Sequence, residues 1–469
     1  MAFSDIYFIY AFLPVFLLLY WATPRWAKTL LLFVASLVFY AVGSWEQPGY
    51  FLLLLGTLIV TYLAARWLDK AKRHRDLILL LSVALLGGAL IFFKYTDFLL
   101  GSAESIFGFF GLNYTFPRLG LLLPLGLSFY IFQASAYLAD VYNREYAAET
   151  NFIRFGAYLT MFPYVLSGPL VPYPQIRRGM VGKKLTLHSL ADGLRLVVIG
   201  LGLKVVLAGN IGGLWREITK IGYDSISPCL AWLALWTYSF QLYFDFYGYS
   251  LIAKGLGAMI GFEIPDNFRE PYTSKSMTDF WRRWHITLGA WFRKYIYIPL
   301  GGNRAGTART IFNLAVVWCL TGLWHGAGVN FILWGLLLCV VIVAEKFLYK
   351  KYLDRFPVLG HAYMLVLIPV FWAIFAIEDA EMLGIFFGKL FPFLPSTLPS
   401  IEPTDFIRLG KDYIVYFLVA GVFSTSLPRR LYEKFKDHWI TSVLLVAVFG
   451  ITLYCICMGL NDPFMYFRF

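Results

Sequence analysis

Apolar residues follow one another in long uninterrupted runs from one end of the chain to the other. A run of about 20 such residues can cross a bilayer as a helix, and continuous runs favour helices over the alternating pattern of a membrane barrel. Only these two structures satisfy their backbone in lipid. We therefore predict an all-α polytopic membrane protein with about 12 spans. Clear examples of the runs are Ile6–Ala22, Leu30–Val42, Leu77–Phe93, Phe331–Ala344, Met364–Ile377 and Ile440–Met458.

The polar stretches between these runs are short. The longest are about Lys94–Arg118, Gln175–Ser189 and Asp266–Arg309, which predicts a single membrane domain over residues 1–469. Hydrophobic residues make up 59% of the chain and charged residues 14%, too few charges to cover a soluble globule of this size. The five cysteines show no zinc-ligand spacing, so we predict no metal site and no bound cofactor.

The formal net charge of +12 is concentrated in short loops between the apolar runs. The loop Arg66–Arg75 is rich in cations, whereas the preceding loop Trp45–Gly49 has none. Cytoplasmic loops of membrane proteins carry an excess of Lys and Arg. This pattern places Arg66–Arg75 in the cytoplasm and the N-terminus outside, and it argues against a nucleic-acid partner.

Two further segments do not read as simple spans. Leu121–Tyr142 opens with Pro124 and Gly126. Met161–Arg178 contains four prolines, which one uninterrupted helix cannot accommodate. Broken backbone at membrane depth is tolerated only when it packs in protein or lines a watery cavity. These segments predict re-entrant elements or an interior chamber; the alternative is an interfacial loop outside the bilayer.

The segment Asp279–Arg304, "DFWRRWHITLGAWFRKYIYIPLGGNR", combines cations, aromatic residues and His285. On one helix, its large apolar side chains would share an arc, with the cations on neighbouring stripes. Such a helix would lie along the membrane interface, with its cations toward anionic groups. Those groups are either lipid phosphates or the phosphates of an acyl carrier or coenzyme A. The arc consists of Trp281, Trp284, Leu288, Trp291 and Tyr295, and the stripes of Arg282, Arg293, Arg283 and Lys294.

His325 ends one apolar run, and the next run begins at Val329. Glycines 322, 326 and 328 surround it, so we expect the backbone to bend and a substrate to approach closely. An ionisable residue inside a membrane is costly and is a functional hypothesis by default. Imidazole is well suited to accept a hydroxyl proton near neutral pH. His325 is therefore our candidate general base; the alternative is a structural histidine at a helix junction.

Asp245 lies inside a long apolar run, four residues after Gln241 and thus on the same helix face. A buried carboxylate needs a partner, which we expect to be a cation or a tyrosine hydroxyl from another helix. This predicts a clamp between helices in preference to direct chemistry.

Three motifs in this order and spacing resemble the membrane-bound O-acyltransferase superfamily: "QLYFDFYGYS" (Gln241–Ser250), the segment Asp279–Arg304, and "GLWHGAG" (Gly322–Gly328). They are most similar to the bacterial branch that contains alginate O-acetyltransferases, with D-alanyl-transfer proteins of teichoic acids as relatives. The resemblance runs from the N-terminus to about Phe347, with the core motifs within about 119–335. Residues 348–469 are similar only as additional spans.

This resemblance implies a ring of about 12 tilted helices, with re-entrant and interfacial helices around a central funnel or tunnel. It implies that His325 is the central catalytic histidine and that His285 assists it. Other residues of the same motifs are the candidates for binding substrate or donor. They are Arg282, Arg283, Trp284, Arg293, Lys294, Asn303, Trp324, Asp245, Tyr249 and Gln241.

The function that follows is O-acyl transfer, most simply of acetyl, in a bacterial plasma membrane. The co-substrate would be acetyl-CoA or an acyl carrier on the cytoplasmic side. The acceptor would be a hydroxyl of an extracytoplasmic polysaccharide or cell-wall polymer, reached directly or through a partner acyltransferase. Three alternatives stay open: D-alanyl transfer to teichoic acid, a transporter that relays protons through His325 and Asp245, and a structural scaffold for polysaccharide secretion.

Overall fold

The computed structural model describes residues 2–112, 114–182, 185–393 and 400–459, and these residues form helices and turns without any strand. The all-α prediction is confirmed. Within the described residues, six helical stretches are long and apolar enough to span a membrane, and three shorter helices, 8–22, 28–43 and 414–423, are also apolar. The six are Pro48–Lys70, Arg75–Phe109, Leu187–Ile221, Val329–Arg355, Pro357–Ala376 and Trp439–Cys457. A ring of about 12 spans stays a prediction.

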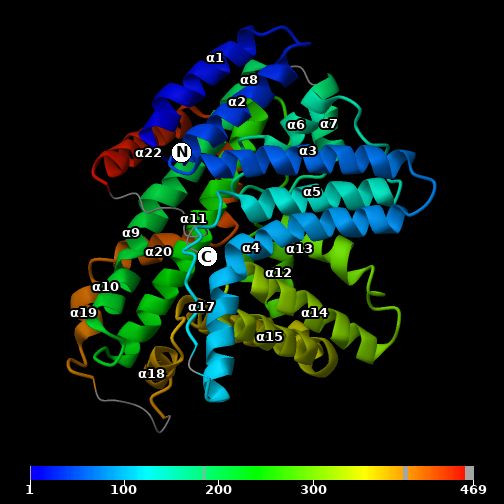
Figure 1. Cartoon of the computed structure of the whole chain (residues 1–469). Coiled ribbons are helices and arrows are strands. Elements are labelled where there is room, and N and C mark those ends of the chain that lie inside the picture. Colours follow the sequence, from blue (N-terminus) through cyan, green and yellow to red (C-terminus); the bar gives the residue numbers. More distant parts are fainter. Residues whose placement is uncertain (1, 113, 183–184, 394–399, 460–469) are drawn as a thin grey trace. The chain divides into compact units, whose positions relative to one another are not determined.

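The chain folds into two compact units, and the first comprises Met1–Leu194 with Ala253–Pro265. Within it, helices α3, α4 and α5 lie side by side, and α2 packs along α6 (Figure 1). The helices of this unit are η1 (Phe8–Phe12), α1 (Leu13–Ala22), α2 (Lys28–Gly43), α3 (Pro48–Lys70), α4 (Arg75–Phe109), α5 (Leu127–Tyr142), α6 (Phe152–Thr160), α7 (Tyr173–Gly182) and the first part of α8 (Leu187–Leu201).

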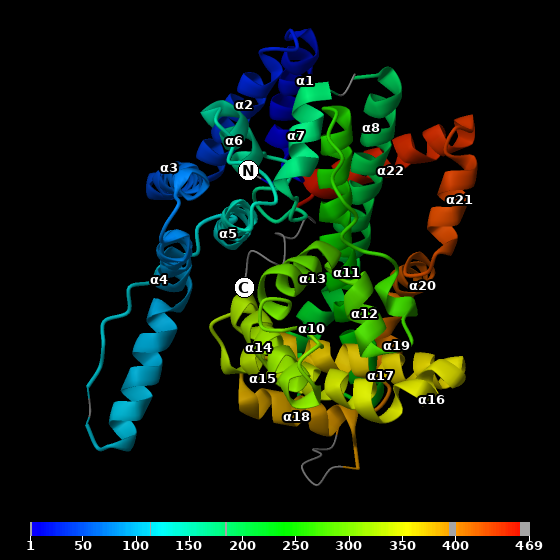
Figure 2. The ribbon, with the colours of Figure 1, turned by 90° about the vertical axis from the view of Figure 1, so that its right-hand side faces the viewer.

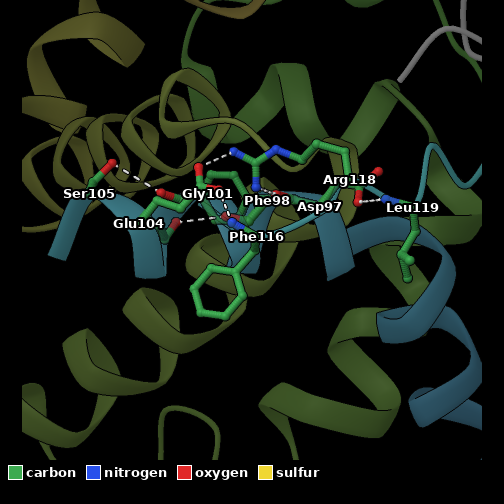
Figure 3. A network of polar contacts seen from close by, with 9 residues as sticks. Asp97, Phe98, Gly101, Glu104, Ser105, Phe116, Arg118 and Leu119 are labelled. Carbon is green, nitrogen blue, oxygen red and sulfur yellow. Dashed lines mark hydrogen bonds and ion pairs between the residues drawn. The ribbon is translucent and has the colours of Figure 1, made fainter. Parts of the chain in front are cut away.

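Helix α4 has 35 residues, so it continues well into the stretch that the sequence pattern assigned to a polar break (Figure 2). The following loop returns along it and is held by its polar side chains (Figure 3). The Asp97 carboxylate accepts hydrogen bonds from the backbone of Leu119 and Gly120, at 2.8 and 2.9 Å. Glu104 pairs with Arg118 at 2.5 Å. The polar residues of Lys94–Arg118 therefore hold a loop against the second half of α4, which continues to Phe109.

The proline-rich segment of the first unit contains non-helical backbone that is buried. Residues 161–171 lie between α6 and α7, outside any helix, and all of them are buried. The backbone N–H of Phe162 donates to the Ser36 hydroxyl at 3.1 Å. At Gly126, where φ is +67°, a Cβ atom would lie 2.3 Å from the Val165 carbonyl oxygen. This backbone is thus packed in protein, and a re-entrant element at membrane depth stays a prediction.

The second unit comprises Arg195–Ile252 and Asp266–Phe469, with its last described residue at position 459. It contains the end of α8, then η2 (Gly202–Ala208), α9 (Gly209–Ile211), α10 (Gly213–Ile221), most of α11 (Pro228–Met259), η3 (Pro271–Thr273), α12 (Met277–Arg283), α13 (Ile286–Phe292), η4 (Arg293–Tyr297), α14 (Thr307–His325), α15 (Val329–Ala344), η5 (Glu345–Tyr349), α16 (Lys350–Arg355), α17 (Pro357–Ala376), α18 (Ala380–Leu390), α19 (Asp405–Gly410), α20 (Ile414–Phe423), α21 (Leu427–Phe435) and α22 (Trp439–Cys457).

Helices α14 and α15 form the closest antiparallel pair of this unit and pack against α12 and α17 (Figure 1). A Cβ atom at Gly322 would lie 2.4 Å from the Phe331 carbonyl oxygen, and one at Gly335 would lie 2.4 Å from the Trp318 carbonyl oxygen. Glycine at both positions therefore permits the close approach of these two backbones. Of the predicted C-terminal spans, α17 and α22 are long enough to cross a bilayer, and residues 460–469 lie outside the described residues.

Candidate active site

The basic aromatic segment is divided into three helices, so the prediction of a single helix was wrong. Helix α12 ends at Arg283, α13 begins at Ile286, and the π-helix η4 follows from Arg293. His285 lies at the break, with a left-handed backbone conformation at φ +45°. A non-glycine residue adopts this conformation only where surrounding contacts maintain it.

Asn267 supplies those contacts. Its backbone carbonyl accepts a hydrogen bond from the N–H of Ile286 at 2.9 Å. Its side-chain oxygen accepts from the N–H and the hydroxyl of Thr287, at 3.2 and 2.9 Å, and lies 3.2 Å from Nδ1 of His285. These hydrogen bonds replace the helical ones that are lost at the break, so the non-helical turn is stable.

The same contacts define the protonation of His285. Because the Asn267 oxygen is an acceptor, Nδ1 of the neutral imidazole carries the proton and donates it, and Nε2 is the basic nitrogen. The side chain is buried, with 3% of the residue exposed. Burial lowers the pKa of His285 well below its usual value, so the ring is neutral at physiological pH.

His325 lies at the last position of α14, and Gly326 ends the helix with an extended backbone. Its ring is buried among aromatic side chains, with centroids 4.6 Å from Trp324, 5.0 Å from Trp334 and 5.0 Å from Phe375. The Trp324 ring also lies 6.0 Å from the His285 ring. The two predicted histidines therefore both contact one tryptophan, although they are 40 residues apart in the sequence.

An aromatic cluster encloses this pair. Trp284, which directly follows α12, is almost fully buried and stacks on Phe280 at 5.5 Å and 18°. Trp372 of α17 lies 5.1 Å from Trp284 and 6.2 Å from Trp334. Aromatic rings exclude water from the histidines, which strengthens electrostatic interactions there.

Two of the glycines near His325 are in close contact with neighbouring side chains in this structure. A Cβ atom at Gly326 would lie 2.1 Å from the Phe331 ring, and one at Gly328 would lie 2.4 Å from the Asn330 side-chain oxygen. These positions let the chain turn tightly from α14 into α15, and the turn sets the place of His325 at the end of its helix.

Asp245 is buried on α11, and Lys204 from η2 pairs with it, Nζ to Oδ1, at 2.5 Å. The predicted cationic partner is thus present and comes from another helix. The two backbones approach closely here, since a Cβ atom at Gly248 would lie 2.5 Å from the Gly200 carbonyl oxygen. Gln241 and Tyr249, on the same face of α11, are buried as well. This arrangement is the predicted clamp between helices.

The cationic candidates occupy different environments. Arg283 is engaged locally, with its guanidinium 2.9 Å from the Asp279 carboxylate and 3.2 Å from the Thr273 hydroxyl. Arg282 and Arg293 are exposed, and Asn303 lies in an exposed turn before α14. Lys294 lies over the Tyr295 ring at 5.1 Å. The exposed arginines are thus the members of the set that a large anionic molecule can reach.

Glu345 is a residue of this region that the sequence analysis did not single out. It is fully buried at the start of η5, and its carboxylate accepts from the N–H groups of Met277 and Thr278, at 2.5 and 2.9 Å. The Thr278 hydroxyl donates to it at 2.7 Å. A carboxylate at a helix N-terminus stabilises the helix. Glu345 thereby anchors the start of α12, whose other end leads to His285.

Of the residues that the sequence reasoning missed, Lys204 and Glu345 share a signal that the sequence contained, and Asn267 does not. Lys204 lies inside an apolar run, and Glu345 lies at the end of one. An ionisable residue in such a position is costly, so each is a candidate for a specific role. Asn267 has no comparable pattern, because a lone asparagine in a polar stretch is ordinary. Only its contacts with Ile286 and Thr287 distinguish it.

These features define an all-helical, multi-pass membrane protein with two histidines in a buried aromatic cluster. The chain matches the model of the membrane-bound O-acyltransferase family over residues 39–384, and it belongs to that family. It is therefore an acyltransferase.

The named relatives fall into acetyl- and alanyl-transferring proteins. The chain is 36% identical to the probable alginate O-acetylase AlgI of Pseudomonas putida, over 100% of both chains. It is 36% identical to the peptidoglycan O-acetyltransferase of Helicobacter pylori, over 98% of this chain and 96% of that one. The teichoic acid D-alanyltransferase of Bacillus subtilis is 27% identical over 50% of this chain and 62% of its own.

Proposed function

We propose that this protein transfers acetyl groups from an activated donor on the cytoplasmic side to hydroxyl groups of an extracytoplasmic polysaccharide. The single observation that carries the proposal is the shared contact of His285 and His325 with Trp324, at 6.0 and 4.6 Å, inside a buried aromatic cluster. A neutral imidazole in a dry site can accept a proton from a hydroxyl. Acetyl is favoured over D-alanyl because the full-length similarity is to proteins named for O-acetyl transfer.

The chemistry is acyl substitution. His325 accepts the proton of the acceptor hydroxyl, the hydroxyl oxygen attacks the acyl carbonyl carbon, and the bond from that carbon to the donor's leaving group breaks. The imidazolium then returns the proton to the leaving group. His285 assists by orienting the donor or stabilising charge on the carbonyl oxygen. General-base catalysis of this kind contributes about a hundred- to ten-thousand-fold in rate.

The supporting parts have separate roles in this proposal. The exposed Arg282 and Arg293 face the anionic part of the donor, while Trp284 and Trp324 enclose the reacting groups. In this proposal the whole chain forms a single membrane domain in a bacterial plasma membrane, with its N-terminus outside. The acyl group reaches the polymer directly or through an extracytoplasmic acyltransferase partner. The lipid bilayer is the other partner.

The transporter alternative uses Asp245 and His325 as a proton relay. It is less favoured because Lys204 already engages the Asp245 carboxylate at 2.5 Å in this structure. The scaffold alternative gives no reason for two histidines in one buried aromatic cluster.

The test is acyl transfer by purified protein in membranes, with any partner restored, given labelled acetyl donor and candidate polymers. We expect His325→Ala to lower transfer by a hundredfold or more with unchanged folded yield. His188→Ala is the matched control, because the His188 side chain is 73% exposed and pairs only with the nearby Asp192. Normal transfer by His325→Ala would refute the catalytic assignment. Label that crosses the membrane without acylating any acceptor would favour the transporter.

A further inference from the structure

Helix α21 (Leu427–Phe435) is an amphipathic helix of the second unit that connects α20 to α22 (Figure 2). Leu427, Leu431 and Phe435 are four residues apart and so share one helix face. They are 51%, 47% and 46% exposed, respectively. Within its unit the helix packs against α20. Three large apolar side chains therefore point away from the protein along one face of α21.

Two cations lie directly beside this apolar face. Arg430 and Lys434 are also four residues apart and form the adjacent stripe of α21. Both are exposed, and no carboxylate pairs with either of them within the residues that the structure describes. Lys434 lies over the ring of Phe435 at 5.2 Å. Long cationic side chains in such a place cover apolar surface with their stems and extend their charges toward an anionic layer.

The opposite side of α21 is attached to the protein. Arg429 lies about 160° around the helix from Leu431. Its guanidinium pairs with the Glu270 carboxylate at 3.0 Å, in the loop that precedes α12. Tyr432, at the neighbouring position on that side, is partly buried. These contacts fix the rotation of the helix, so that the face with Leu431 and the stripe with Arg430 both point outward.

The course of the chain puts α21 at the level of the lipid headgroups. Only three residues separate its end from α22 (Trp439–Cys457), which is long and apolar enough to span a membrane. Trp439, the first residue of that helix, is 69% exposed, and tryptophans are enriched at the membrane–water interface. Residues 424–438 include four cations and two acidic residues, a pattern typical of a cytoplasmic loop. The negative surface potential of the cytoplasmic leaflet attracts such segments.

We propose that α21 binds the anionic headgroups of phospholipids in the cytoplasmic leaflet. Leu427, Leu431 and Phe435 enter the boundary between headgroups and acyl chains, and Arg430 and Lys434 contact the lipid phosphates. A lipid surface fits this helix better than an acidic protein does, because a helix joined so closely to a membrane span meets the headgroups there. The site is separate from the histidine cluster and does not depend on the reaction proposed for it.

The test is hydrogen exchange, followed by mass spectrometry, of the full-length protein in nanodiscs. In the wild type, the amides of residues 427–438 should exchange about tenfold more slowly in discs that contain phosphatidylglycerol than in discs of phosphatidylcholine alone. Arg430→Gln/Lys434→Gln should remove most of this difference. Its exchange in phosphatidylcholine should equal that of the wild type, which shows that the helix is intact. The matched control Lys72→Gln/Arg73→Gln removes the same charge from exposed positions of the loop before α4 and should keep the difference.

A second variant tests the apolar face. Leu431→Ala/Phe435→Ala keeps good helix formers in place of the large side chains, and it should also reduce the slowing by phosphatidylglycerol. If this variant is slowed as strongly as the wild type, the apolar face does not enter the lipid and the proposal is wrong. Equal exchange of the wild type in the two kinds of disc would overturn it as well. Slowing by an added acyl carrier protein, an acidic soluble protein, without any effect of phosphatidylglycerol would assign the face to a protein partner instead.

Discussion

The Lys204–Asp245 pair and the two histidines are polar groups buried in the second unit, but the protein stabilises them in different ways. The lysine and the carboxylate neutralise each other at 2.5 Å where the backbones of Gly200 and Gly248 meet. The histidines contact aromatic rings and, in the case of His285, one amide oxygen.

From this difference we expect a structural role for the ion pair and a chemical role for the histidines. Lys204 and Asp245 neutralise each other's charge and connect η2 with α11. A neutral imidazole among rings can still take up a proton when a hydroxyl is placed against it.

Removing one member of the buried pair should have the largest effect on stability. Asp245→Leu leaves the Lys204 ammonium buried without its counter-ion, which costs about 3–5 kcal/mol in the free energy of unfolding. Folded yield and thermal unfolding in detergent would measure the loss. The double variant Lys204→Met/Asp245→Leu removes both charges and should recover most of the stability and the transfer activity. A stable but inactive double variant would show that the pair takes part in the reaction.

Glu345→Ala should have a smaller effect on stability, because it removes the carboxylate that accepts from the first turn of α12. The loss of a helix cap costs about 0.5–2 kcal/mol, and we expect the upper end because two N–H groups and the hydroxyls of Thr278 and Tyr363 lose their acceptor. Chemical unfolding, followed by tryptophan fluorescence, would measure it. Glu345→Gln retains one acceptor oxygen and should lose less than half as much. Equal losses in the two variants would contradict a capping role.

Asn267→Leu should act on the reaction with little effect on folding. It removes the oxygen that orients His285, which should raise the activation barrier by about 1.4 kcal/mol and so lower kcat about tenfold. KM for the donor should change by less than about twofold. Ser250→Ala is the control, since that hydroxyl accepts from the Asn267 amide nitrogen at 3.5 Å and does not contact the oxygen that orients His285. If Asn267→Leu lowers the folded yield instead of kcat, Asn267 supports the fold and does not position the histidine.

The difference between the two regions also explains which parts of the site were predictable. Asp245 and His325 stood out because a polar residue inside an apolar run is expensive in lipid. Their partners did not, because Lys204 lies 41 residues from Asp245, and no periodicity connects them. The close packing of Gly326 was not predictable for the same reason, since the Phe331 ring beside it comes from the next helix.

The helical membrane class and the candidate histidines were predictable from the sequence, because span length, charge distribution and the three motifs are local properties of the chain. Tertiary structure decided how the segment Asp279–Arg304 folds. Its aromatic periodicity fits one helix, yet Asn267 offers hydrogen bonds to Ile286 and Thr287 that compete with the helical ones. A break in a helix is stable only when another part of the chain satisfies the backbone groups that it exposes.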